Sequence, residues 1–104
     1  MGWTRAARQE ENRRWQEERQ KAEDRRRREE ALVGDLAKRL ELWLTGARYR
    51  QLADAVEAMA VADSELKRRA QWLAWVRSYA TRVEQEVVRE LPDPERGPEP
   101  RWRY

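Results

Sequence analysis

The chain contains no cysteine, no histidine and no phenylalanine. Without cysteine there are no disulfides and no thiolate chemistry, and this absence is typical of a reducing compartment, so we expect a cytoplasmic protein. Without histidine, the most frequent general base and the most frequent transition-metal ligand are both missing. We therefore predict that the protein is not an enzyme and that it holds no metal and no cofactor.

Long apolar runs are also missing from the sequence. No stretch approaches the ~18 apolar residues of a membrane-spanning helix, and the N-terminus lacks the apolar centre of a signal peptide. Glycine-rich phosphate loops and nucleophile motifs do not occur either. The sequence therefore predicts neither a membrane partner nor a small-molecule substrate.

Charge, by contrast, is abundant and nearly balanced. Charged residues make up 41% of the chain, with 23 basic and 20 acidic side chains and a net charge of +3. A globular domain usually has about 25%. An excess this small gives only mild attraction to polyanions, unlike the strong field of a protein that coats DNA.

The apolar residues are unevenly distributed and define three segments. Six lie in residues 1–30, 32 in residues 31–90 and three in residues 91–104. We therefore predict a charged helical arm over 1–30, a helical hairpin core over 31–91 and a proline-rich, disordered tail over 92–104. A core region of about 60 residues is marginally stable by itself, so self-association or docking on a partner is expected.

The arm is predicted to be one long solvated helix over residues 5–30. Glycine and proline are absent from it, strong helix formers dominate, and Thr4 is suited to be the N-cap. Opposite charges recur four residues apart, as in Glu10 and Arg14. Apolar positions are too few for a self-sufficient coiled coil.

The two core segments show helical spacing of apolar residues. The apolar spacing in residues 31–61 predicts a continuous or kinked helix, with Gly46 in its middle. A second helix is predicted over about 65–90, and Asp63 or Ser64 is its expected N-cap. A short connection makes the two helices antiparallel. The expected core consists of Leu32, Val33, Leu36, Leu40, Trp43, Leu44, Leu52, Val56 and Met59 against Leu66, Leu73, Val76, Ala80, Val83 and Val87.

Several aromatic residues are candidates for partner binding. Most of them have polar surroundings that cannot bury them locally, and exposed tryptophans are enriched at interfaces. Trp75 differs because Trp72 lies three residues before it. One of the two can cover the end of the hairpin core while the other lies at the edge of that core. The partner-binding candidates are Trp3, Trp15, Trp75, Trp102 and Tyr104.

Two basic clusters are candidates for phosphate contacts. The run Arg25, Arg26, Arg27 and Arg28 lies between acidic pairs, and four consecutive helical residues point around most of a turn, which favours a solvated face. The second cluster, Lys67, Arg68, Arg69 and Arg77, lies near tryptophans, a combination found in nucleic-acid-binding faces.

One stretch resembles a known group of proteins. Trp72-Leu73-Ala74-Trp75, followed by Tyr79-Ala80 and Arg82, is similar to the C-terminal part of a group of largely uncharacterised bacterial proteins. Members usually carry an upstream helix-turn-helix-like region, which we do not find here, so the resemblance implies a helical, non-catalytic module without DNA reading.

Three functional hypotheses remain from the sequence. The first is a helical module that binds a protein partner or itself. The second is a nucleic-acid-associated accessory factor whose arginines contact phosphates. The third is a small inhibitor of another protein, encoded by a mobile element.

Overall fold

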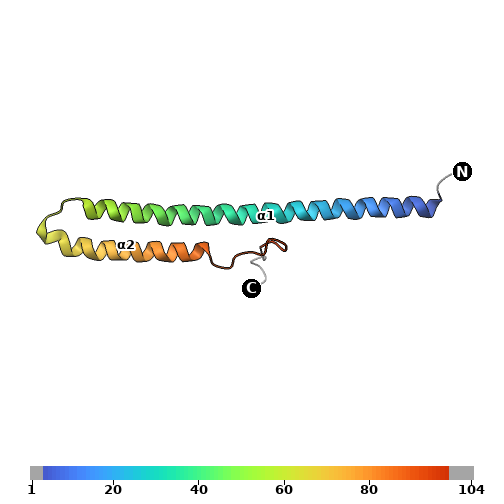
Figure 1. The fold of residues 1–104 in the computed structure, drawn as a ribbon. Helices are drawn as coiled ribbons and strands as arrows, with labels where there is room; N and C mark the ends of the chain where they lie inside the picture. Colours follow the sequence, from blue (N-terminus) through green and yellow to red (C-terminus); the bar gives the residue numbers. More distant parts are fainter. Residues whose placement is uncertain (1–3, 99–104) are drawn as a thin grey trace. The chain divides into compact units, whose positions relative to one another are not determined.

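Two helices joined by a hairpin make up the protein, in a computed structural model that describes residues 4–98. Helix α1 spans Arg5–Ala58, a 3₁₀ turn η1 spans Asp63–Glu65, and helix α2 spans Leu66–Val87 (Figure 1). Within residues 4–98 there is no β-strand, which confirms the all-α prediction. Neither helix is long and apolar enough to span a bilayer among the described residues.

The chain divides into two compact units. The first comprises residues 1–33 and 92–104, and the second comprises residues 34–91. In the first unit, α1 begins as predicted, because the Thr4 hydroxyl accepts a hydrogen bond from the Ala7 amide at 3.2 Å. Exposed ion pairs follow, with Arg13 at 3.0 Å from Glu10 and 3.9 Å from Glu17. Such pairs contribute only a few tenths of a kcal/mol each.

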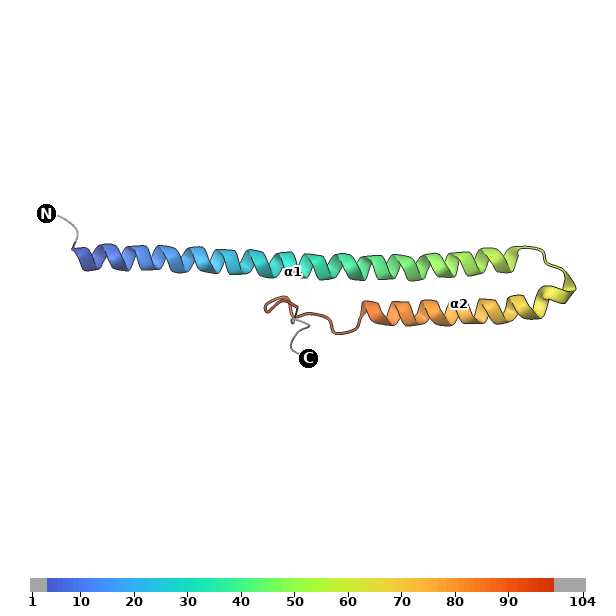
Figure 2. The ribbon, with the colours of Figure 1, turned by 180° about the vertical axis from the view of Figure 1, so that it is seen from behind.

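A turn follows α2 in the proline-rich segment (Figure 2). The Asp93 carbonyl accepts hydrogen bonds from the amides of Arg96 and Gly97 at 3.2 and 2.7 Å, and Gly97 has a φ of 81°. A Cβ at Gly97 would lie 3.1 Å from Cγ of Arg28, so this glycine permits a close approach to α1. Within the tail predicted to be disordered, residues 93–97 form a hydrogen-bonded turn. Residues 99–104 lie outside the described part.

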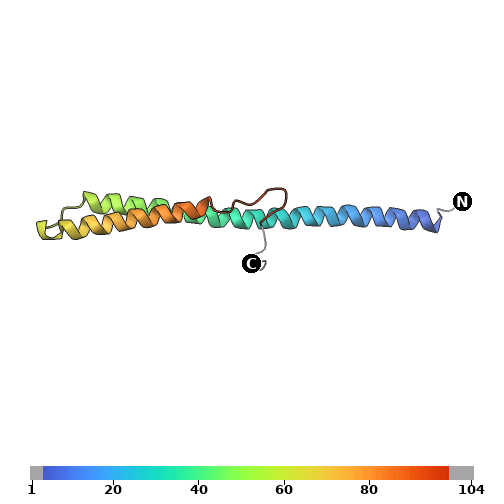
Figure 3. The ribbon, with the colours of Figure 1, turned by 90° about the horizontal axis from the view of Figure 1, so that it is seen from below.

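The second unit is an antiparallel helix pair, in which α2 lies beside the part of α1 that follows residue 34 (Figures 1 and 3). Its buried core is small, and it consists of Ala53 on α1 with Leu73, Val76 and Ala80 on α2. The predicted core residues in the middle of α2, Leu73, Val76 and Ala80, are therefore confirmed. The N-cap prediction was wrong, because η1 precedes α2 and no side chain caps the helix.

The predicted core face of α1 was largely wrong. Leu36, Leu40 and Trp43 were expected inside, yet they are 63%, 53% and 55% exposed. The face that α1 turns toward α2 instead carries the small residues Gly46 and Ala53. Small side chains let the two backbones approach closely, and Leu36, Leu40 and Trp43, about 80–140° around the helix from Ala53, then point away from α2.

Gly46 is buried on the side of α1 that packs against α2. Helix α1 continues through it, which confirms a continuous helix and excludes a turn. A Cβ at this position would lie 3.2 Å from Cγ of Glu84 and 3.6 Å from the Ala80 carbonyl oxygen. The glycine therefore offsets its helix penalty of up to ~1 kcal/mol by allowing contact with α2.

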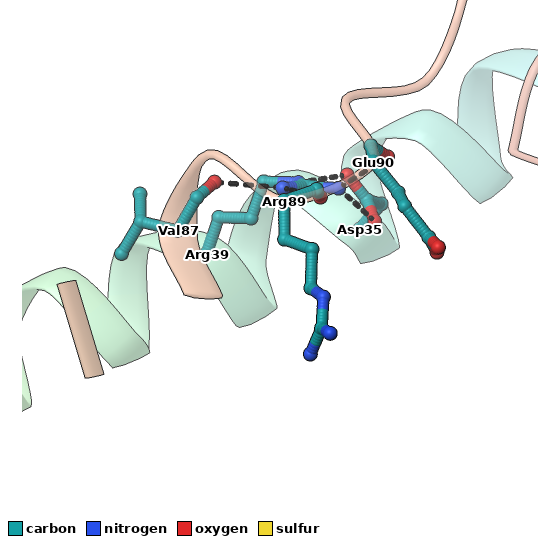
Figure 4. A network of polar contacts seen from close by, with 5 residues as sticks. All are labelled: Asp35, Arg39, Val87, Arg89 and Glu90. Atoms are coloured by element: carbon teal, nitrogen blue, oxygen red, sulfur yellow. Dashed lines mark hydrogen bonds and ion pairs between the residues drawn. The ribbon is translucent and has the colours of Figure 1, made fainter. Parts of the chain in front are cut away.

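Arg39 fastens the C-terminal end of α2 to α1 (Figure 4). Its guanidinium donates hydrogen bonds to the carbonyls of Val87, Arg89 and Glu90 at 2.7, 2.8 and 2.9 Å. Asp35, one turn earlier on α1, accepts a further bond at 2.7 Å and orients the guanidinium. The last carbonyls of a helix have no partner within it, so Arg39 acts as a C-cap supplied by the other helix.

We expect the substitution Arg39→Met to destabilise the hairpin by about 2–3 kcal/mol, because it removes charge-assisted bonds to carbonyls and leaves Asp35 without its partner. The measurement is urea unfolding followed by circular dichroism. Arg48→Met, an exposed arginine on the same helix, is the matched control and is expected to change stability by less than about 0.5 kcal/mol. Equal effects of the two substitutions would contradict the capping role.

The two glycines of α1 are expected to respond in opposite directions. Gly34 has no atom within 4 Å of an added Cβ, so Gly34→Ala should stabilise the helix by about 0.5–1 kcal/mol. Gly46→Leu should destabilise the hairpin, because its side chain would push Glu84 and the α2 backbone away. Thermal unfolding of the two variants measures both effects, and a stable Gly46→Leu variant would contradict the close-approach argument.

Candidate protein-interaction surface

Aromatic side chains from both helices gather on one side of the hairpin. The rings of Trp75 and Tyr79 are stacked with centroids 5.7 Å apart, and Tyr49 of α1 approaches Tyr79 at 5.8 Å in a tilted arrangement. Leu52 follows Tyr49 by three residues, and Trp72 precedes Trp75 by three, so helical spacing places both on the same side. We call Tyr49, Leu52, Trp72, Trp75 and Tyr79 the aromatic face.

The aromatic face is open to solvent although three of its rings, those of Tyr49, Trp75 and Tyr79, pack against one another. Trp75 is 58% exposed, and the other four residues are also exposed. The guanidinium of Arg82 lies 5.5 Å from the Tyr79 ring centroid, in a cation–π position at the edge of this surface. Stacked aromatic residues that stay exposed are typical of binding surfaces, where they bury a large area with little loss of conformational freedom.

Ion pairs occupy the other side of the contact between the helices. Arg50 follows Tyr49 and so points about 100° further around α1. It donates to the Glu84 carboxylate at 2.5 and 3.1 Å. This hydrogen bond lowers the pKa of Glu84 and raises the pKa of Arg50, so both groups stay charged near neutrality. The contact between the two helices thus has a row of ion pairs along one edge and aromatic rings along the other.

Arg77 extends the row of ion pairs toward the connection between the helices. Its guanidinium lies 2.7 Å from Glu57 and 3.1 Å from Asp54. The hydrogen bonds that Arg77 donates to Glu57 and Asp54 raise the pKa of Arg77. Both carboxylates come from α1, so Arg77 is a link between helices rather than a cation directed outward.

The remaining members of the second basic cluster have different surroundings. Arg68 lies 3.6 Å from Glu65. Arg69 donates a hydrogen bond at 2.5 Å to the Met59 carbonyl, which directly follows the last residue of α1. Lys67 is exposed. The structure therefore does not bring Lys67, Arg68, Arg69 and Arg77 together as a single basic patch.

The arginine run lies on α1 in the first unit, and its members face different directions. Arg25 and Arg28 line a shallow depression together with Lys21 and Asp24. Arg26 lies 3.7 Å from Glu30, and Arg27 is exposed. This arrangement agrees with the expectation that four consecutive residues cannot form one flat surface.

Of the two aromatic candidates within residues 4–98, Trp75 lies on the aromatic face and Trp15 does not. Trp15 is 62% exposed in the first unit, with the Arg19 guanidinium 5.4 Å from its ring centroid. Trp3, Trp102 and Tyr104 lie outside the described residues. Tyr49, Leu52 and Tyr79 were not predicted as members of a site, because only the packing of the two helices brings α1 and α2 residues into one surface.

No protein-family model, no curated protein and no solved structure matches this chain. The resemblance carried by the Trp72–Trp75 stretch therefore stays a prediction.

The pair of Arg50 and Glu84 predicts an acid-sensitive hairpin. The folded-state pKa of Glu84 is lowered, so its contribution to stability is complete above the unfolded pKa of about 4.3 and is lost as pH falls through the folded-state pKa. The melting temperatures of the wild type and of Glu84→Gln should differ at pH 7 and converge in strong acid. Glu41→Gln, an exposed substitution on α1, is the control, and a difference that stays constant with pH would contradict the assignment.

Proposed function

We propose that the protein is a non-catalytic helical interaction module that binds a protein partner through the aromatic face. The observation that carries this proposal is the stacked, exposed pair Trp75 and Tyr79, joined from the other helix by Tyr49. Tryptophan, tyrosine and arginine dominate the binding energy of protein interfaces. Arg82 at the rim completes that combination.

The small size of the hairpin core supports the same conclusion. Among residues 34–91, the buried apolar side chains are Ala53, Leu73, Val76 and Ala80, and two of these four are alanines. A partner that covers the aromatic face would bury Trp75, whose complete burial contributes about 2–3 kcal/mol. A partner that binds the folded hairpin but not the unfolded chain would therefore increase the stability of the hairpin.

The chemistry of the described residues favours binding over catalysis. A general acid near neutral pH needs a raised carboxylate pKa, whereas the pKa of Glu84 is lowered by its hydrogen bond with Arg50. No histidine or cysteine is available to act as a base or nucleophile.

Phosphate binding has less support as an alternative. Arg68, Arg77 and Arg26 lie within 4 Å of carboxylates, so their charge is compensated locally. Binding through phosphates weakens steeply with salt, with a slope of about −0.9 per neutralised phosphate on duplex DNA. An apolar interface has no such dependence, and salt therefore separates the two alternatives.

Site-specific photo-crosslinking in cells of the native host tests the proposal. The full chain carries p-benzoylphenylalanine in place of Leu52 on the aromatic face or, as a control, in place of exposed Gln85 on α2. We expect a protein adduct from position 52 that position 85 does not give and that persists in high-salt extracts. In the chain with the probe at 52, Trp75→Ala should weaken binding about 30-fold, the effect of removing about 2 kcal/mol at a hot spot.

The proposal is contradicted if the probes at positions 52 and 85 give the same set of adducts. It is also contradicted if Trp75→Ala leaves the adduct yield from position 52 unchanged. Crosslinks to nucleic acid that disappear with salt would support phosphate binding instead. Circular dichroism of Trp75→Ala serves as the folding control, and its spectrum should match the wild type because Trp75 lies outside the buried core.

A further inference from the structure

A second apolar surface lies on α1 away from the aromatic face. Leu36, Leu40, Trp43 and Ala47 follow one another at spacings of four, three and four residues, which is the pattern of a coiled-coil seam. They lie about 80–140° around the helix from Ala53 in one direction, whereas Tyr49 and Leu52 lie in the other. We call these four residues the outer stripe.

The three large side chains of the outer stripe are exposed, Ala47 is half-buried, and the stripe has an apolar border. Leu36, Leu40 and Trp43 are each more than half exposed. Ala37 and Leu44 continue the surface on the side away from α2, and Leu44 is exposed as well. These side chains leave about 500 Å² of apolar surface on each copy of the chain.

We propose that the outer stripe pairs with the outer stripe of a second copy of this chain, antiparallel and about a two-fold axis. In this register Leu40 faces Trp43 of the other copy and Leu36 faces Ala47. Each layer then combines a larger side chain with a smaller one, as close packing requires. Ala37 and Leu44 come together along the border. The surface is therefore complementary to itself, which is the condition for a two-fold interface.

Buried area and charge both agree with a second copy as the occupant. Two stripes would bury about 1,000 Å², the area at which a specific interface begins, so we expect micromolar affinity. Residues 34–91 carry ten basic and nine acidic side chains. Many of these are paired within the hairpin, including Arg39 with Asp35 and Arg50 with Glu84. Two copies therefore approach without strong mutual repulsion.

This pairing is separate from the proposed function, because it uses the opposite side of α1 from the aromatic face. Trp75→Ala should leave self-association unchanged, and a stripe variant should keep the crosslinks from position 52. Failure of one proposal is thus distinguishable from failure of the other.

The test is sedimentation equilibrium of the full chain over a range of about 1–100 µM, which brackets micromolar affinity. The wild type should change from monomer to dimer over this range. Leu40→Glu and Trp43→Lys should each remain monomeric to the highest concentration, a loss of at least 30-fold in affinity, with helical circular dichroism retained. Arg48→Glu, an exposed control on the same helix, should dimerise like the wild type.

A mixture of Leu40→Glu and Trp43→Lys chains tests the antiparallel register. The mixed dimer contains one Glu–Lys layer and one unchanged Trp43–Leu40 layer, so equimolar mixing should restore dimerisation. A parallel pairing would place glutamate against leucine and lysine against tryptophan, and mixing would restore nothing. A monomeric wild type, dimeric single variants or a mixture that stays monomeric would each overturn the proposal.

If Leu40→Glu or Trp43→Lys alone loses its helical circular dichroism signal, the mixture of the two variants still tests the proposed pairing. Recovery of both helicity and dimer on mixing supports the pairing, because folding is then coupled to association. An absence of recovery overturns it.

Discussion

The close approach of two helix backbones at Gly46, Ala53 and Ala80 determines how the hairpin presents its other side chains. An added Cβ at Gly46 would lie 3.6 Å from the Ala80 carbonyl oxygen, and both alanines are fully buried. Such a contact gains dispersion energy and excludes water, but it buries little apolar area because its residues are small. The large apolar side chains therefore lie to either side of the contact, where a two-helix structure cannot cover them.

Polar contacts supply specificity that this small core does not. Arg39 fixes the end of α2 through three carbonyls, and Arg50 with Glu84 fixes the middle of the pair. Both contacts join residues more than 30 positions apart, so they define which turn of α1 faces which turn of α2. The backbone at Glu90 has a φ of 46°, a conformation that is costly for a residue with a side chain. The hydrogen bond that Arg39 donates to the Glu90 carbonyl stabilises the chain in this turn.

Periodicity in the sequence predicted the helices, their antiparallel pairing and the α2 core, since Leu73, Val76 and Ala80 repeat at helical spacing. It failed for α1, where apolar residues occupy most of the circumference between residues 32 and 59. Hydrophobicity alone then selects Leu36, Leu40 and Trp43 as core, whereas the helices pack through Gly46 and Ala53. Glycine was considered only as a kink or turn, and its use in a close helix contact depends on Ala80 and Glu84, which lie far away in the sequence. Trp75 was predicted as a binding residue, but its neighbours on the aromatic face were missed for the same reason, because Tyr49 meets Tyr79 only after the hairpin forms.

The positions of the two apolar surfaces on α1 also bear on how binding and assembly combine. The aromatic face and the outer stripe lie in opposite directions around the helix from Ala53, so a dimer formed through the stripe would keep two aromatic faces exposed. Two linked binding surfaces raise the effective local concentration of the second contact, and avidity can exceed single-site affinity by 10²–10⁴ where geometry allows both to engage. A weak micromolar pairing of hairpins is then useful, because binding of a repetitive or dimeric partner to both aromatic faces would itself favour the dimer.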